Sequence, residues 1–319
     1  MKDWIMSDIG PKLDKAQYGN RKGSSTEHLL VNLMDKILRM LDANKSSAVI
    51  ASMVDWASAF DRQDPTLAIE KFLKLGVRES LILVLVSYLT DRNMRVRFHN
   101  SYSSTYPLPG GGPQGTLMGV IMYLVQSNDN ADVVDEDMRF KFVDDLSILE
   151  LVLLSSWLSE FNVKQQVAND IGIDEYFISP ENLKTQNYLD SIAEWTEENL
   201  MQINEKKSNY MLFSRSTTEV ATRLKINNKV IDRLEEQKVL GVWITTWLDW
   251  QKNTDEIVKK SFARLSLITK LKYVGTSITD LIDVYVLFIR SLLEYCSTVW
   301  HSTLTVDQSN SIKMYKKFA

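Results

Sequence analysis

The sequence predicts an α+β fold, in which a small β-sheet packs against helices. Short runs rich in β-branched and apolar residues, at 47–55, 138–151 and 210–213, are typical of buried strands. Apolar residues recur about every 3.6 positions over 29–41 and 255–273, as they do on one face of a helix. With 319 residues, of which 45% are hydrophobic, the chain can bury a large core spread over two or three subdomains.

Cysteine and histidine are too scarce for a disulfide framework or a zinc site. The only cysteine is Cys296, and the three histidines lie far apart in the sequence. Any bound metal is therefore expected to have oxygen ligands, which favours Mg²⁺ or Mn²⁺. No signal peptide begins the sequence, and no apolar run reaches the ~20 residues that span a bilayer. We expect an intracellular protein without a membrane partner, in either the nucleus or the cytoplasm.

Charge is distributed unevenly along the chain. The net charge is −4, but residues 1–200 hold 19 basic and 29 acidic side chains, whereas residues 201–319 hold 18 basic and 12 acidic ones. An acidic body beside a basic C-terminal third suits a metal site next to a groove for a polyanion. The alternative is that both regions are simply solvated.

The N-terminal region should contain a basic loop, a helix and a buried strand. The loop 18–26 is rich in Gly and Ser and carries Arg21 and Lys22, so it is either a phosphate-binding loop or a plain connector. A helix is expected over 29–41, followed by a strand over 47–55 that ends on the carboxylate of Asp55. Asp64 is expected to cap a helix that starts at Pro65.

Glycines in the segment 76–115 should mark the end of a helix and a loop. Gly76 should end the helix that starts at Pro65, and a second helix should cover 79–90. Residues 94–99 alternate like an exposed strand, with a turn at 100–101. The segment 109–115 is the most glycine-dense of the chain and carries Gln114, which can donate and accept hydrogen bonds. It is either a ligand-binding loop or a structural one before a helix over 116–125.

Asp144 and Asp145 form the tip of a predicted hairpin between the apolar runs 138–143 and 146–151. Two adjacent carboxylates repel one another, and a divalent cation relieves that repulsion. The alternative is a solvated turn, because Asp is common in turns for local reasons.

The remaining elements are mostly helical. A helix is expected to start at Ser179-Pro180 and to run to Asn199, and a turn at 204–208 carries Lys207 before the strand 210–213. A hairpin should turn at 227–228, and a strand should cover 239–244. Helices are expected over 255–273, 279–300 and 306–318.

Several motifs, in this order, resemble those of reverse transcriptases, most closely those of non-LTR retrotransposons of the jockey-like type. They are 17–26 (QYGNRKGSST), 54–61 (VDWASAFD), 113–116 (PQGT), 142–145 (FVDD) and 203–208 (INEKKS). Two C-terminal segments, 239–242 (VLGV) and 293–300 (LEYCSTVW), also fit, so the resemblance covers nearly the whole chain. Agreement of several independent pieces is more specific than any one motif.

The resemblance implies the right-hand architecture of a polymerase, with an antiparallel palm sheet packed on helices. We expect partial fingers at 1–45, a palm at 46–215 with a finger-like insertion near 91–110, and a mostly helical thumb at 216–319. Only sixteen residues precede Gln17, so an N-terminally truncated reverse transcriptase without its endonuclease is expected. Gly112 stands where a β-branched residue is usual, which should loosen that turn, and Val120 stands where proline is usual.

The resemblance also implies an active site for RNA-directed DNA polymerisation. Asp55 and Asp144 would bridge two Mg²⁺ ions (or Mn²⁺) roughly 3.5–4 Å apart, and Asp145 would complete the metal site electrostatically. Phe60 would exclude a ribose 2′-hydroxyl and so select deoxynucleotides. Lys207 would lie near the leaving phosphate as a proton donor, or is simply a solvated lysine.

The remaining implied contacts are with the substrates, namely an RNA template, a DNA primer and deoxynucleoside triphosphates. Gln114 and Gly115 would contact the template and the nascent pair, and Arg21 and Lys22 the incoming substrate. Five cations of the thumb would follow the primer–template backbone, or form only a solvated basic face. These are Lys259, Lys260, Arg264, Lys270 and Lys272.

Two other hypotheses share the carboxylates. The chain could be an inactive remnant that still binds nucleic acid, which incomplete fingers would favour. A two-metal nuclease would use the same Asp residues but leaves Phe60, Gln114 and the thumb-like end unexplained.

Overall fold

A five-stranded sheet lies at the centre of the computed structural model, which describes residues 1–43, 47–153, 176–215 and 220–316. Its strands, in spatial order, are β13 (Asp232–Arg233), β9 (Asn209–Ser214), β1 (Ser47–Val54), β7 (Asp145–Leu153) and β6 (Arg139–Phe142). β1 is antiparallel to both neighbours, β7 is antiparallel to β6, and the short edge strand β13 joins β9 in parallel. The predicted α+β class and antiparallel central sheet are therefore confirmed.

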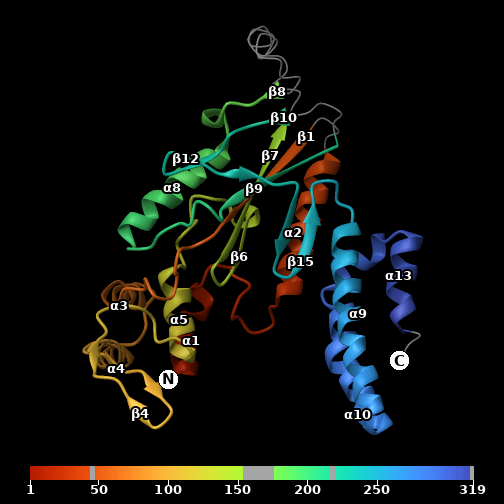
Figure 1. Ribbon diagram of the computed structural model, residues 1–319. Coiled ribbons are helices and arrows are strands. Elements are labelled where there is room, and N and C mark those ends of the chain that lie inside the picture. The colour runs from red at the N-terminus through yellow and green to blue at the C-terminus, as the bar shows by residue number, and fades with distance from the viewer. Residues whose placement is uncertain (44–46, 154–175, 216–219, 317–319) are drawn as a thin grey trace.

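The central strand β1 is buried on both faces because helices cover each side of the sheet (Figure 1). Val49 and Ala51 share a core with α2 (Thr26–Ala43) and the C-terminal helices. Ala48 and Ile50 point to the opposite face and share a core with α8 (Lys184–Glu198). Successive strand residues alternate between faces, so a strand covered on both sides must be apolar throughout.

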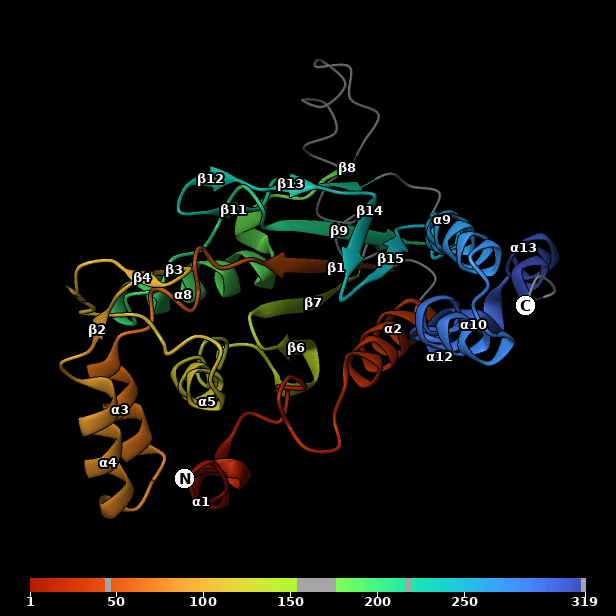
Figure 2. The ribbon, with the colours of Figure 1, turned by 60° about the horizontal axis from the view of Figure 1, so that its bottom comes forward.

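A separate helical unit packs below one end of the sheet (Figure 2). It consists of α1 (Lys2–Ile9), α3 (Pro65–Lys74), α4 (Glu79–Leu89) and α5 (Leu117–Gln126), which share a third core. The predicted cap of α3 is present, since the Asp64 side chain accepts hydrogen bonds from the N–H groups of Thr66 and Leu67. Gly76, with φ of +80°, follows the end of α3 as expected. Helix α1 was not predicted from the sequence.

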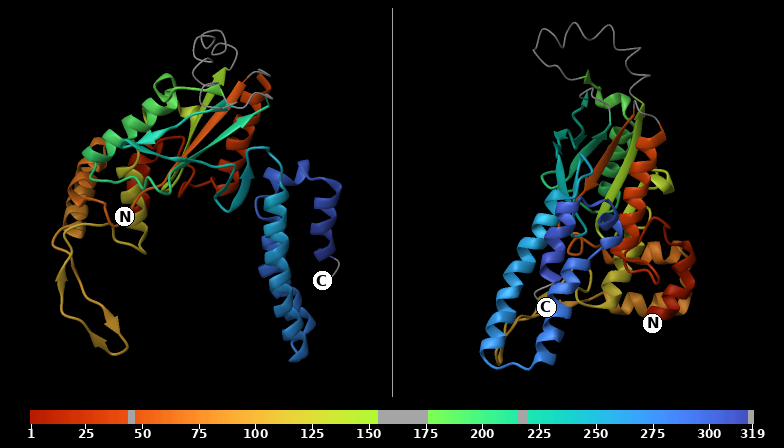
Figure 3. Two further views of the ribbon diagram at one scale, coloured as in Figure 1. Left: turned by 45° about the horizontal axis from the view of Figure 1, so that its top comes forward. Right: turned by 90° about the vertical axis from the view of Figure 1, so that its right-hand side faces the viewer.

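An exposed hairpin projects from the helical unit, and we call residues 91–110 the arm (Figure 3). Its strands are β2 (Asn93–Met94), β3 (Arg97–Phe98), β4 (Ser101–Tyr102) and β5 (Tyr106–Pro107). The prediction of one continuous strand over 94–99 is wrong: two residues on one side and three on the other separate the β2–β5 ladder from the β3–β4 ladder. The turn lies at 99–100, one position earlier than expected.

The C-terminal third corrects two further predictions. The predicted strand 239–244 is a hairpin of β14 (Glu236–Val239) and β15 (Val242–Thr245), because Leu240 and Gly241 turn the chain with positive φ. The predicted helix 279–300 is interrupted at Cys296, whose φ is +49°. The helices here are α9 (Gln251–Tyr273), α10 (Ile278–Val284), the π-helical η4 (Tyr285–Arg290), α11 (Ser291–Glu294), α12 (Ser297–Trp300) and α13 (Val306–Lys316).

Short elements complete the described chain. They are η1 (Gly10–Lys12), η2 (Glu136–Met138), β8 (Tyr176–Phe177), η3 (Pro180–Asn182), β10 (Val220–Ala221), β11 (Lys225–Ile226), β12 (Lys229–Val230) and η5 (His301–Thr303). The hairpin expected at 227–228 is confirmed between β11 and β12, with positive φ at both asparagines. None of the helices in the described ranges combines the length and apolar character that crossing a membrane requires.

A buried ion pair attaches the N-terminal segment to the edge of the sheet. The Lys141 ammonium of β6 lies 2.6 Å from the Asp14 carboxylate, and only 2% and 3% of these two side chains are exposed. Arg139 contacts the same carboxylate at 3.0 Å. Burial raises the pKa of Asp14, but the two cations outweigh that effect and hold the pKa below its usual value.

Replacement of Asp14 tests how much stability depends on this pair. Asp14→Asn should lower the free energy of unfolding by about 3–5 kcal/mol, because it leaves buried cations without their counter-charge. Arg39→Ala, which removes the exposed ion pair with Asp35, should leave it nearly unchanged, because solvent screens an exposed pair. Urea unfolding of both variants measures the difference, and equal effects would contradict the prediction.

Candidate active site

Three carboxylates meet at one end of the central sheet. In the antiparallel register of β1 and β7, Val54 lies opposite Leu146. The next residue on β1 is Asp55 and the preceding one on β7 is Asp145, so these two leave neighbouring strands side by side. Asp144 occupies the two-residue turn between β6 and β7, because Phe142 pairs directly with Asp145. The structure thus places the three residues predicted to form the metal site at the same end of the sheet.

The turn that carries Asp144 has an unusual backbone. Val143 has φ of +56°, a left-handed conformation that costs free energy for a β-branched residue. Its N–H donates to the side-chain oxygen of Gln17 at 2.9 Å, and the same oxygen accepts from the N–H of Gly19 at 2.8 Å. A Cβ added to Gly19 would lie 2.5 Å from the Val143 nitrogen. Gln17 and Gly19 therefore hold the strained turn, a role that the sequence motif did not reveal.

The carboxylates influence one another electrostatically. Burial, together with the charges of Asp144 and Asp55, raises the pKa of Asp145 to about 6. Burial also raises the pKa of Asp55, an effect that Lys207 opposes and Asp144 reinforces. Three like charges at a sheet end are costly when all are ionised, and a cation removes that cost.

The Asp55 carboxylate has one oxygen suited to a ligand. Its Oδ2 is buried and has no hydrogen-bond partner in the described chain. An ionised, partly buried oxygen without a partner fits a hard divalent cation such as Mg²⁺ or Mn²⁺. Within the described ranges, no three acidic, His or Cys side chains lie close enough to form a complete metal site. The donor set suits a cation held by two carboxylates and completed by substrate oxygens.

The turn 204–208 fixes the position of Asp55. The Asp55 N–H donates to the Ser208 hydroxyl at 3.0 Å, and the Asp55 carbonyl accepts from the Asn204 N–H at 2.8 Å. The Asn204 side chain also hydrogen bonds the carboxylate, which favours its ionised form. Lys207 projects from this turn with an exposed side chain close enough to influence Asp55. The motif identified Lys207 but not the positioning roles of Asn204 and Ser208.

The ring of Tyr123 lies between Phe60 and the carboxylates. Its half-buried ring stacks on Tyr123 of α5, with centroids 5.1 Å apart. The buried Tyr123 hydroxyl has no partner among the described residues, and burial with the charges of Asp144 and Asp145 raises its pKa. The structure thus places the half-buried Phe60 at the edge of the site.

The glycine-rich loop packs against the segment that carries Phe60. The Gly112 N–H donates to the Phe60 carbonyl, and the Gly111 N–H donates to the Gln63 carbonyl, both at 2.8 Å. A Cβ on Gly112 would lie 1.8 Å from the buried Gln63 amide oxygen. The expectation that Gly112 loosens this turn is wrong, because Gln63 occupies the space that a side chain would fill.

Gln114 and Gly115 lie exposed beyond that turn. The Gln114 side-chain amide donates to the Asp61 carboxylate at 2.5 Å. Asp61 lies six residues after Asp55 in the sequence, so this bond orients Gln114 toward the segment that follows Asp55. Gly115 has φ of +73° and open space around its Cα, so a ligand can approach its backbone closely. Their contacts with template remain a prediction.

The predicted cations differ in how the fold uses them. Arg21 donates to the Asp14 carbonyl at 2.8 Å, whereas Lys22 is exposed. On α9, Arg264 donates to the carbonyl of Phe288, and Lys260 lies 3.7 Å from Glu256. Lys259, Lys270 and Lys272 are exposed on the same helix. All five α9 cations are exposed, yet Lys260 and Arg264 face the neighbouring helices, so the five do not form one face.

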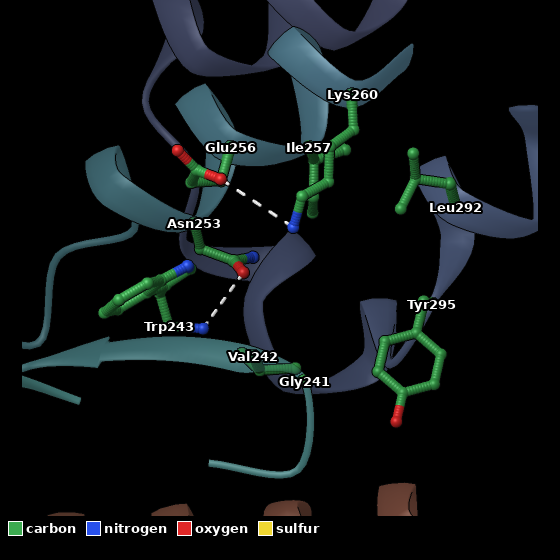
Figure 4. Close-up of a pocket in the computed structure, with 9 residues that line it drawn as sticks. All are labelled: Gly241, Val242, Trp243, Asn253, Glu256, Ile257, Lys260, Leu292 and Tyr295. Carbon is green, nitrogen blue, oxygen red and sulfur yellow. Dashed lines mark hydrogen bonds and ion pairs between the residues drawn. The ribbon is translucent and has the colours of Figure 1, made fainter. Parts of the chain in front are cut away.

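Tyr295 joins three motifs that are far apart in the sequence. Its hydroxyl donates to the Leu240 carbonyl at 2.8 Å and lies 3.2 Å from the Thr26 hydroxyl. The ring closes one side of a small cavity behind the β14–β15 turn, which Asn253 and Lys260 also line (Figure 4). The buried Asn253 amide nitrogen has no partner in the described chain, so this cavity suits a water molecule.

The sequence is similar to RNA-directed DNA polymerases of mobile elements. The chain is 25% identical over 257 residues to a probable RNA-directed DNA polymerase from transposon BS of Drosophila melanogaster, covering 78% of this chain and 26% of that protein. It is 25% identical over 269 residues to the RNA-directed DNA polymerase from mobile element jockey of the same organism, covering 81% and 26%. The resemblance to jockey-like elements is thereby confirmed in sequence. The chain spans about a quarter of the length of these relatives.

Other comparisons give weaker likenesses. No family model matches the chain. Among solved structures, a telomerase from Candida tropicalis with a fragment of telomeric RNA is 11% identical, with a TM-score of 0.49, over 94% of this chain and 46% of that one. A telomerase from Candida albicans, also with telomeric RNA, is 12% identical, with a TM-score of 0.48, over 98% and 55%.

The raised pKa of Asp145 predicts how stability depends on pH. Between about pH 4 and pH 6 the folded chain binds this proton more tightly than the unfolded chain does, so stability falls as the pH rises. Because Asp145 is partly exposed, we expect a loss of about 1 kcal/mol. Mg²⁺ should therefore raise the thermal unfolding midpoint more at pH 7.5 than at pH 5, and Asp145→Asn should flatten both dependences. A Mg²⁺ effect that is equal at the two pH values would contradict this.

The close contact between Gly19 and Val143 predicts a second effect on the site. Gly19→Ala should displace the turn that carries Asp144, lower stability by about 1–3 kcal/mol and abolish stabilisation by Mg²⁺. Gly10→Ala is the matched control, because Gly10 has open space around it and a negative φ. Thermal unfolding with and without Mg²⁺ compares the two, and an unchanged Mg²⁺ response in Gly19→Ala would refute the role of the contact.

Proposed function

We propose that this chain is the polymerase core of a reverse transcriptase, an RNA-directed DNA polymerase that extends a DNA primer on an RNA template. The observation that carries the proposal is the convergence of Asp55, Asp144 and Asp145 at one sheet end, where one Asp55 oxygen has no hydrogen-bond partner among the described residues. Sequence similarity to RNA-directed DNA polymerases supports the same activity.

In this proposal the fold divides into the parts of a polymerase right hand. Residues 46–215 form the palm, with the arm as a finger-like insertion near 91–110. Residues 1–45 supply part of the fingers, and residues 216–319 form the thumb. The arm and the helices α9 and α10 project from opposite sides of the sheet, an arrangement that supports this division (Figure 3).

The carboxylates would hold Mg²⁺, with Mn²⁺ as an alternative. When bound there, the metal supplies positive charge that activates a primer hydroxyl and neutralises the triphosphate. Asp55 is held for this task by Asn204 and Ser208, so it needs no reorganisation on binding. Asp144 is presented by the turn that Gln17 and Gly19 hold.

Neighbouring residues would bind and select the nucleotide. The ring of Phe60, fixed by stacking on Tyr123, would occupy the space beside the sugar and exclude a 2′-hydroxyl. Gln114, oriented by Asp61, and the open backbone at Gly115 would contact the template and nascent pair. Lys207, on a turn beside Asp55, would donate a proton to the departing pyrophosphate.

Basic residues outside the carboxylate site would contact the substrate phosphates. Lys22 and, through its second guanidinium nitrogen, Arg21 would face the incoming triphosphate. The exposed Lys259, Lys270 and Lys272 of α9 would contact the backbone of the primer–template duplex, with Lys260 and Arg264 contributing to the local potential.

Primer extension tests the proposed activity. On poly(rA) annealed to oligo(dT), with dTTP and Mg²⁺, the chain should add thymidylate. Asp144→Asn should reduce the rate by at least about 100-fold, since stabilisation of charge by a metal is worth several kcal/mol. Asp35→Asn, a matched change at an exposed site on α2, should leave the rate unchanged.

Two outcomes would reject the polymerase. One is no incorporation by the unaltered chain, and the other is equal incorporation by Asp144→Asn. Salt-sensitive RNA binding without any extension would instead identify a binding protein that has lost catalysis.

A further inference from the structure

The arm exposes more aromatic surface than a solvated hairpin needs. Phe98, Tyr102 and Tyr106 are 74%, 52% and 58% exposed, although they are separated by only a few residues. None of the three belongs to any of the buried cores of the described chain. Exposed apolar groups clustered on one element mark a binding surface more often than isolated ones do.

Apart from Asp91 at its first position, the charged residues of the arm are all cationic. Arg92, Arg95 and Arg97 lie on it, and the sequence holds no Asp or Glu between positions 92 and 110. Within the described ranges, none of these arginines forms an ion pair with a carboxylate. The Arg95 guanidinium lies 4.2 Å from the centre of the Tyr102 ring, and that of Arg97 lies 5.8 Å from it. The arm therefore exposes guanidinium groups and aromatic rings side by side.

The base of the arm is continuous with the candidate active site. Arg92 donates to the carbonyl of Gly110 at 3.1 Å and also to that of Gly111. Gly111 and Gly112 in turn donate to the carbonyls of Gln63 and Phe60. A strand bound along the arm would thus lead to the loop that holds Gln114.

We propose that the arm binds single-stranded nucleic acid, with its arginines on the phosphates and its exposed rings stacked on unpaired bases. Only an unpaired strand offers both groups at once, because the bases of a duplex are already stacked on each other. A protein partner would need an acidic surface with apolar pockets, whereas a single strand requires no further matching. If the proposed polymerase function holds, the bound strand is the part of the RNA template that has yet to be copied. This identification of the strand rests on that function.

Binding of a fluorescein-labelled oligo(rU) to the full chain, measured by anisotropy without metal or nucleotide, tests the arm. Arg95→Ala combined with Arg97→Ala should reduce the slope of log affinity against log salt by about 1.4, since each single-strand phosphate contact contributes about 0.7. Phe98→Ala combined with Tyr102→Ala should weaken binding by about tenfold at constant salt. These side chains are exposed, so the thermal unfolding midpoint should stay unchanged in both variants.

Arg223→Ala combined with Lys225→Ala is the matched control, because it removes two exposed cations from the β10–β11 region. It should bind oligo(rU) like the unaltered chain. Equal binding by the arm variants and the unaltered chain would overturn the proposal. So would an equal loss of affinity for a double-stranded RNA, or an arm variant that changes only the oligomeric state.

The outcome is independent of the polymerase activity. Loss of oligo(rU) binding in the arm variants supports the surface even if the chain extends no primer. Extension by the unaltered chain together with unchanged RNA binding by the arm variants would reject the arm and leave the polymerase intact.

Discussion

The contact between Asp14 and Lys141 is the constraint on which the site depends. It is a buried ion pair at the outer edge of the sheet, and such pairs stabilise a fold only when further hydrogen bonds satisfy both partners. Here Arg139 and the N–H of Ala16 share the Asp14 carboxylate. The pair holds the adjoining backbone against β6, where Lys141 exchanges hydrogen bonds with Ala16 and Tyr18. The edge of the sheet is thereby covered, and Gln17 is placed beside the turn that carries Asp144.

Two opposing electrostatic arrangements therefore lie one strand apart. At Lys141 the fold places cations around a buried carboxylate and satisfies them. At Asp55 and Asp145 it gathers carboxylates, and one Asp55 oxygen has no hydrogen-bond partner in the part of the chain that the structure describes. The first arrangement stabilises the fold, whereas the second destabilises it, as is common where a binding site needs groups that oppose folding. This contrast supports a metal role for the second cluster better than the number of carboxylates does.

The parts of the site that the sequence predicted are those set by strand register and local turns. Asp55 ends a buried strand and Asp144 lies in a hairpin turn, so antiparallel pairing alone brings them together. Phe60 and Gln114 were identified through the family motifs. The roles of Gln17, Asn204 and Tyr295 could not be predicted, because each acts through a contact with a distant segment. The hydroxyl of Tyr295, for example, meets a residue 269 positions away.

Two of the errors in secondary structure, at 239–244 and 279–300, have a common physical origin. Leu240 and Cys296 both adopt positive φ, which their side chains do not favour, and both lie within apolar patterns that predict continuous elements. Tertiary contacts stabilise these exceptions: Tyr295 bonds the Leu240 carbonyl, and Cys296 is buried in the core beside α2. Local patterns report the preference of a residue, whereas the fold decides whether that preference is satisfied.

The segment from Asp14 to Thr26 connects the turn that carries Asp144 to the C-terminal helices. One end is fixed on β6 and holds the Val143 turn, and the other begins α2, where Thr26 meets Tyr295. The Thr298 hydroxyl also donates to the Glu27 carboxylate, so the C-terminal helices rest on the first turn of α2. One continuous run of backbone thus joins the turn that carries Asp144 to the part of α2 on which the C-terminal helices rest.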